Sequence, residues 1–358
     1  MSVRVAASAG FCFGVDRAVG LVEQTVREGK RAVTLGPIIH NHHVVQHFAA
    51  LGVREIASPE EVPVGSAVII RSHGVSRAVY EALQARGLEI IDATCPFVSR
   101  IHRIVQEAEA NGRQPLIIGT PEHPEVVAIA GWCRHPLVFP DGEALQKWLD
   151  DDPKRHDLPF TMVSQTTSTQ FLWDSCKKIA KKVCTNLEFF DTICKATENR
   201  QAEAAALAAQ CDAMIVVGDR KSSNTGRLAH ICAAHCPQVF LVDNASELDL
   251  SKLRQAGTIG ITAGEDDEDL SGALTRANDA LCALTCQKTL LALLSANAEA
   301  PDGYCAFYAP ASPVSAADAA ASETAHLLVC SENAEADLYT LFSAKAHVLQ
   351  LLETTDRT

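Results

Sequence analysis

Three cysteines occupy the same kind of position in this chain, directly after an apolar run and directly before a helix-like segment. Cys12 ends VRVAASAGFC, Cys95 ends LEIIDATC and Cys194 ends LEFFDTIC. In open α/β sheets, residues between the carboxyl end of a strand and the next helix lie on the rim where ligands bind. The thiols are far apart in sequence, so only the fold can bring them together. Three converging thiolates without a fourth are typical of an iron–sulfur cluster that keeps one iron open for chemistry.

Three histidines follow other apolar runs and form a second group of candidates. They are His40 in GPIIHN, His73 in RSHGV and His123 in EHPEV. A lone histidine usually has no ligand, but three in turns on one rim indicate a binding site. Other histidines of the same stretch fit ordinary exposed or helical positions: His42, His43 and His47.

A polar turn after the apolar run AMIVV is suited to phosphate. The segment GDRKSSN offers the side chains of Ser222, Ser223 and Asn224 together with the N–H groups of a following helix. Serine and asparagine also serve as plain helix caps, so this turn gains its meaning from its neighbours.

One carboxylate and one hydroxyl are expected beside these donors. Glu125 lies two residues after His123, and bound phosphates raise the pKa of a nearby glutamate, which suits a proton donor. Thr166 lies in the QTT step that follows FTMVS. Without these neighbours, Glu125 would be an ordinary solvated loop residue.

Short apolar runs alternate with longer amphipathic segments up to about residue 287, which predicts βα units on parallel sheets. The segments IIDATCP and FFDTICK are similar, with Asp three residues before Cys in both, which suggests an internal duplication. We expect an α/β fold with a trefoil of three small parallel-sheet domains around one central site. The expected divisions are 1–95, in which residues 1–13 bring Cys12 to the centre, then 96–193, 194–287 and a C-terminal extension 288–358 of unknown role. Its last stretch, from AHLLVC onward, suits a strand and a helix.

Composition limits the class of protein. The chain has 358 residues, a net charge of −13 and thirteen scattered cysteines, which fit a reduced cytoplasm better than a disulfide framework. Its apolar runs are far shorter than the roughly 20 residues of a membrane span. The acidic charge gives no electrostatic basis for binding nucleic acid. We therefore expect a cytoplasmic protein with no membrane and no nucleic-acid partner.

The motifs together resemble the 4-hydroxy-3-methylbut-2-enyl diphosphate reductase family. The resemblance rests on GFCFGVDRAV, IIHN, RSHGV, DATCPFV, EHPEV, QTT, DTICKATENRQ and SSNTGRL, in this order from residue 1 to about 287. It implies three α/β domains around a [4Fe-4S] cluster held by Cys12, Cys95 and Cys194. It also implies reductive dehydroxylation of that diphosphate to isopentenyl and dimethylallyl diphosphate, the last step of the non-mevalonate isoprenoid pathway.

The resemblance also implies roles for the other candidates. Glu125 would supply a proton, Thr166 would orient the substrate hydroxyl and His123 would act beside them. Ferredoxin or flavodoxin would deliver electrons one at a time. The diphosphate would be held by His40, His73, His123, Ser222, Ser223 and Asn224.

One segment departs from the family pattern. The family usually has a phosphate-binding serine two residues after a TAG turn, whereas this chain continues with Glu265, Asp266, Asp267 and Glu268. One carboxylate at about 4 Å from one phosphate charge costs roughly 4 kcal/mol at an effective dielectric near 20. We therefore expect these acids to turn outward, or else activity to be reduced.

Three alternatives remain open at this point. An iron–sulfur hydro-lyase would dehydrate its substrate without an electron donor. A non-enzymatic redox sensor would have no use for the histidines or for the SSN turn. A zinc site built from the three cysteines and a histidine is the third, although structural zinc usually has close ligand pairs.

Overall fold

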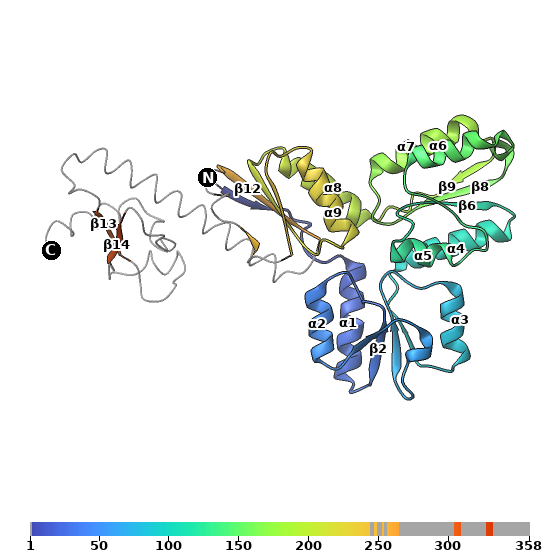
Figure 1. Ribbon diagram of the computed structural model, residues 1–358, viewed down its shortest axis with the longest axis horizontal. Helices are drawn as coiled ribbons and strands as arrows, with labels where there is room; N and C mark the ends of the chain where they lie inside the picture. Colours follow the sequence, from blue (N-terminus) through green and yellow to red (C-terminus); the bar gives the residue numbers. More distant parts are fainter. Residues whose placement is uncertain are drawn as a thin grey trace.

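The structure is a computed structural model, and it describes residues 2–243, 247–248, 253, 256–264, 304–308 and 327–331. Three separate four-stranded sheets, all parallel, form three lobes around a common centre (Figure 1). The predicted α/β class with three small parallel sheets is confirmed.

The first lobe has strand order β3-β2-β4-β5. Its elements are α1 (Phe13–Arg27), β2 (Ala32–Leu35), α2 (His42–Ala50), β3 (Arg54–Ile56), the 3-10 turn η1 (Pro59–Glu61), β4 (Ala67–Ile70), α3 (Arg77–Ala85) and β5 (Ile90–Asp92). Successive residues of a strand point to opposite faces. Ile69 of β4 therefore packs in the core of α1 and α2, whereas Val68 and Ile70 pack in the core of α3.

The second lobe has strand order β7-β6-β8-β9. Its elements are α4 (Pro96–Ala110), β6 (Gln114–Ile118), α5 (Pro124–Ala130), β7 (Leu137–Phe139), α6 (Gly142–Asp151), the 3-10 turn η2 (Pro153–Asp157), β8 (Phe160–Ser164), α7 (Gln170–Val183) and β9 (Leu187–Phe189). Helices α4 and α5 pack on one face of this sheet, and α6 and α7 pack on the other.

The third lobe has strand order β1-β12-β10-β11. Its elements are β1 (Ser2–Val5), α8 (Lys195–Ala208), β10 (Ala213–Val217), α9 (Ser223–Ala233), β11 (Val239–Val242) and β12 (Thr258–Ala263). Strand β1 pairs in register from Ser2 with Thr258 to Val5 with Ile261. The sequence assigned residues 1–95 to the first domain, but this strand lies in the third sheet, because its ladder partner is β12. The other domain boundaries stay predictions.

Each candidate cysteine lies where the chain passes from one lobe to the next. Cys12 follows β1 of the third sheet and precedes α1, which packs on the first sheet. Cys95 joins the first sheet to α4 of the second, and Cys194 joins the second sheet to α8 of the third. Because each of these three connections runs from one lobe to the next, cysteines that are far apart in the sequence reach one centre.

The predicted extension contributes one described element pair. Strands β13 (Tyr304–Tyr308) and β14 (Leu327–Ser331) form an antiparallel ladder apart from the three lobes (Figure 1). A strand was expected at AHLLVC, and β14 confirms it. The helix expected after it lies outside the described residues.

Candidate active site

One pocket at the junction of the three lobes contains every side chain that the sequence singled out as a site residue. Its lining includes Cys12, Cys95, Cys194, His40, His73, His123, Glu125, Thr166, Ser222, Ser223 and Asn224. The prediction for the other histidines also holds, since His42, His43 and His47 are exposed on α2. Cys211, Cys232 and Cys236 are buried in the third lobe's core, away from the pocket.

The three candidate cysteines share one local geometry. Cys12, Cys95 and Cys194 are the N-cap residues of α1, α4 and α8, and all are free and half-buried. Burial, with a smaller contribution from the neighbouring Cys12 and Cys194, raises the pKa of Cys95 to about 11. Backbone N–H groups of the first turn of α4 oppose this shift by donating to the sulfur. The helix start is thus ready to stabilise a thiolate once an electrophilic group binds.

Gly14 leaves room at the thiol end. A Cβ placed on this residue would lie 2.6 Å from the Sγ of Cys95 and 4.0 Å from the Sγ of Cys12. The missing side chain therefore lets two thiols face the same space.

The spacing of the thiols argues against a single metal ion. Among the residues that the structure describes, only the three histidines form a group of at least three potential ligands whose ligand atoms all lie within 4.8 Å of one another. The three thiol sulfurs are spread more widely. Two sulfurs on one zinc lie at most about 4.6 Å apart, since each Zn–S bond is about 2.3 Å. The thiols fit a larger group with several metal atoms, and soft thiolate ligands favour an iron–sulfur cluster.

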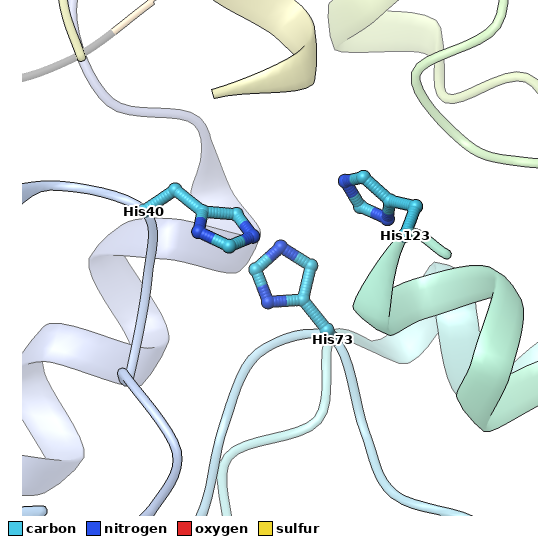
Figure 2. A group of neighbouring side chains, drawn as sticks. All are labelled: His40, His73 and His123. Carbon is cyan, nitrogen blue, oxygen red and sulfur yellow. The ribbon is translucent and has the colours of Figure 1, made fainter. Parts of the chain in front are cut away.

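The three histidines form a second group in the same pocket, which we call the imidazole end, and their rings lie close together on separate loops (Figure 2). The ring centroids are 4.7 Å apart for His40 and His73, 5.4 Å for His73 and His123, and 5.8 Å for His40 and His123. Burial lowers the pKa of His40, lowers that of His73 well below its usual value, and lowers that of His123 to about 4. All three imidazoles are therefore uncharged at neutral pH.

Hydrogen bonding shows what these imidazoles can bind. The backbone N–H of Glu125 donates to Nδ1 of His123 at 3.1 Å, so the neutral ring carries its proton on Nε2. A metal-bound histidine does the opposite, because it presents a lone pair and donates its other N–H. The buried Nε2 of His40 and Nδ1 of His73 have no hydrogen-bond partner within the protein. The group thus suits an anion that accepts N–H donors better than a cation.

Glu125 lies in the first turn of α5 and is 2 % exposed. Its carboxylate accepts the backbone N–H of Thr166 at 2.6 Å and the Oγ1 hydroxyl of Thr166 at 2.7 Å. Burial raises the pKa of Glu125, while both Thr166 contacts and the charge of Arg227 oppose this. A buried carboxyl with a raised pKa and a pocket-lining hydroxyl beside it can hold and pass on a proton.

The start of α9 supplies further polar groups. Ser222 caps the helix, and Oδ1 of Asn224 is buried without a partner. Thr167 donates its hydroxyl to Oγ of Ser223 at 3.3 Å, which links the second lobe to the third. A Cβ on Gly264 would lie 2.8 Å from Nδ2 of Asn224, so the TAG turn ends beside these polar groups at the start of α9. The expectations for Glu265, Asp266, Asp267 and Glu268 lie outside the described residues.

The sequence reasoning missed three arginines around the pocket, of which Arg200 is buried and Arg71 and Arg227 are half-buried. Arg71 and Arg227 each lower the pKa of His123 through their charge, and Arg71 does the same for His73. Arg200 lines the pocket itself and is 6 % exposed. All three lie within or beside quoted motifs, at RSHGV, SSNTGRL and ATENRQ, but nothing in a sequence marks an arginine as buried. These charges explain how an acidic protein offers an anion a favourable site.

Comparison with known proteins places the chain among enzymes of one kind. The family model described as LytB protein matches residues 3–269. A protein of Caldanaerobacter subterraneus subsp. tengcongensis, named 4-hydroxy-3-methylbut-2-enyl diphosphate reductase, is 38% identical over 277 residues, which are 75% of this chain and 93% of that protein. One of the same name from Clostridioides difficile is 38% identical over 269 residues, 74% of this chain and 94% of that protein.

Solved structures give the same result. A structure of (E)-4-hydroxy-3-methyl-but-2-enyl diphosphate reductase, described as the terminal enzyme of the non-mevalonate pathway, has a TM-score of 0.58 and 33% identity over 77% of this chain and 99% of that one. The corresponding reductase from Plasmodium falciparum has a TM-score of 0.71 and 26% identity over 76% of this chain and 86% of that one. Across the part of the chain that the structure describes, no helix has the length and apolar character needed to cross a bilayer.

Proposed function

This chain belongs to the LytB protein family, and we propose that it reduces 4-hydroxy-3-methylbut-2-enyl diphosphate to isopentenyl diphosphate and dimethylallyl diphosphate. This reaction is the last step of the non-mevalonate isoprenoid pathway. The observation that carries the proposal is a single pocket with three thiols at one end, three uncharged imidazoles at the other and one buried carboxyl group on its wall. Each part corresponds to one requirement of the reaction.

The thiol end is the proposed place of a [4Fe-4S] cluster. Cys12, Cys95 and Cys194 would hold it, and Gly14 would leave it room. When bound, the cluster supplies electrons and a Lewis-acidic iron that has no protein ligand. The wide spacing of the thiols supports this assignment over a single zinc ion.

The imidazole end is the proposed diphosphate site. His123 donates from Nε2, and one buried ring nitrogen in each of His40 and His73 has no partner within the protein. The α9 side adds donors from Ser222, Ser223 and Asn224, together with N–H groups at a helix start, which favour anions. Holding the charged end here places the rest of the substrate toward the thiols.

Glu125 and Thr166 are the proposed proton donors. Oγ1 of Thr166 donates to the carboxylate of Glu125. Once Glu125 is protonated, this hydrogen bond reverses, and the Thr166 hydroxyl passes its own proton to the substrate hydroxyl. The C–O bond breaks with uptake of two electrons, and the hydroxyl leaves as water after receiving this proton. A second proton then goes to the allylic carbon skeleton, at one end to give one product or at the other end to give the second. His123 assists by holding the first turn of α5, which carries Glu125.

The electrons have to come from outside the chain. We propose ferredoxin or flavodoxin as donor and the cytoplasm as location, because both follow from the family resemblance and from the reduced cysteines.

An anaerobic assay tests the proposal. Protein reconstituted with iron and sulfide is incubated with 4-hydroxy-3-methylbut-2-enyl diphosphate, with and without dithionite and a viologen mediator. We expect both five-carbon diphosphates only with reductant. Dehydration without reductant would favour a hydro-lyase, and a failure to bind the diphosphate at all would favour a redox sensor.

A further inference from the structure

Arg200 and Glu203 hold the loop that leads to Cys12. Arg200 donates from Nε to the carbonyl oxygen of Ser8 at 2.8 Å and from Nη2 to that of Gly10 at 2.6 Å. Glu203 accepts the backbone N–H groups of Ala7 at 2.7 Å and Ser8 at 2.8 Å, and also the hydroxyl of Ser8. Two charged side chains therefore bind donors and acceptors of the same short loop.

Both residues belong to α8, the helix that starts at Cys194. They are three residues apart and so share one face of the helix. One rigid element thus carries Cys194 at its first turn and fixes the approach to Cys12 along its side. Helix α8 therefore links the positions of two of the three thiols.

Arg200 also brings a positive charge to the thiol end. It is 6 % exposed and lines the pocket. Burial lowers the pKa of Arg200, whereas the neighbouring Cys12, Cys194, Asp16 and Glu203 oppose this, so the guanidinium lies near both thiols and near two carboxylates. An arginine stays charged in proteins even when buried. By contrast, Lys195 beside Cys194 is 75% exposed and pairs with Glu198, so solvent screens its charge.

From these contacts we infer that Arg200 is a positioning residue that fixes the Cys12 loop on α8 and makes the group held by the thiols easier to reduce. Glu203 shares only the first task. A group bound by three thiolates is anionic, and reduction adds a further negative charge, so an adjacent buried cation favours the reduced form. The redox half of this inference rests on the proposed function.

Four variants separate the two roles. Arg200→Gln removes the charge and weakens the loop contacts, while Arg200→Lys keeps the charge but loses the two-pronged contact. Glu203→Gln weakens the loop and keeps the buried cation. Lys195→Gln is the matched control, because it removes an exposed charge next to Cys194.

Two measurements test the charge role and the loop role in these variants. Spectroelectrochemical titration of the anaerobic holoprotein should give a more negative potential for Arg200→Gln only. Hydrogen–deuterium exchange of residues 6–12, in protein without the cluster, should be about tenfold faster or more in Arg200→Gln, Arg200→Lys and Glu203→Gln, since a hydrogen bond to a charged group is lost. Lys195→Gln should match the wild type in both.

The outcomes are distinguishable. An unchanged potential in Arg200→Gln overturns the charge role, and wild-type exchange in both Arg200→Lys and Glu203→Gln overturns the loop role. If Arg200→Gln does not fold or take up iron, those other two variants decide: faster exchange with a wild-type potential supports the inference. If the wild type itself binds no iron–sulfur group, the proposed function fails, while the exchange measurement still tests the loop.

Discussion

The two ends of the pocket use burial in opposite ways. At the thiol end, burial raises the pKa of Cys95 and Cys194, so these thiols keep their protons. At the imidazole end, burial lowers the pKa of His40, His73 and His123, so the rings do not take up a second proton. Cys95, Cys194 and the three imidazoles are therefore uncharged at neutral pH, because burial disfavours charge of either sign.

Filling the pocket moves protons in opposite directions at its two ends. Thiols must lose protons to bind metal, so the proposed cluster would release them. Imidazoles that face a diphosphate keep or gain protons, because an anion favours the donor form. Uncharged thiols such as Cys95 and uncharged imidazoles can thus line one pocket beside charged arginines and still receive a metal group and an anion.

The largest effect should come from the thiol end. Replacing Cys12, Cys95 or Cys194 by serine should abolish activity and remove most of the iron, because a hydroxyl is a poor substitute for a soft thiolate. Iron and sulfide analysis of anaerobically purified protein checks this. Cys133→Ser is the control, since this half-buried cysteine lies outside the pocket. Full iron content in all three variants would show that these thiols do not hold the iron, and the assignment of the thiol end would be wrong.

Next in size is the loss of the proton donor between the ends. Glu125→Gln keeps the size of the side chain but cannot deliver a proton, so turnover should fall about 10²–10⁴-fold. Iron content and diphosphate affinity should stay near wild type. Steady-state rates and calorimetric binding of the substrate measure the two quantities separately. A wild-type rate would exclude Glu125 from the reaction.

A smaller effect is expected at Gly14, where a substitution should weaken cluster binding without lowering stability. Alanine suits a helix better than glycine by about 1 kcal/mol. Its Cβ would nevertheless lie 2.6 Å from the Sγ of Cys95 and force that side chain to move. Gly14→Ala should therefore fold normally by circular dichroism yet hold less iron than the wild type. Gly20→Ala on the same helix is the control, because nothing lies within 4 Å of its new Cβ.

The smallest effect concerns pH at the imidazole end. His123 has a pKa of about 4 in the folded protein and near 6.5 when unfolded. Between these values the unfolded state binds more protons, so the free energy of unfolding should fall as pH drops from about 6.5 toward 4. Urea denaturation of the cluster-free protein at several pH values measures this. His123→Asn should reduce the slope, to which His40 and His73 still contribute, and an equal slope in both proteins would contradict the burial of a neutral ring.

Much of the site could be predicted from the sequence because its residues follow strands. Cys95, His73 and Thr166 each come directly after an apolar run, and parallel sheets bring such positions to one rim. The three-sheet fold followed from the same alternation.

Other features depend on contacts that no local pattern contains. Strand β1 was assigned to the first domain because it comes first in the chain, yet its partner β12 is more than 250 residues away. Arg200 stands in the middle of a polar helix, and only the packing of α8 against the loop before Cys12 buries it. The tautomer of His123 likewise requires the distance to a backbone N–H.

The most direct test of a thiol end and an anion end in one pocket is a Mössbauer spectrum of ⁵⁷Fe-labelled, anaerobically prepared protein, recorded with and without 4-hydroxy-3-methylbut-2-enyl diphosphate. With three cysteine ligands for four irons, one iron should differ from the other three, and its signal alone should change when the substrate binds. Inorganic diphosphate, which has no hydroxyl to reach the thiol end, is the control and should leave that signal in place. Four equivalent irons, or a spectrum that the substrate leaves unchanged, would contradict the account.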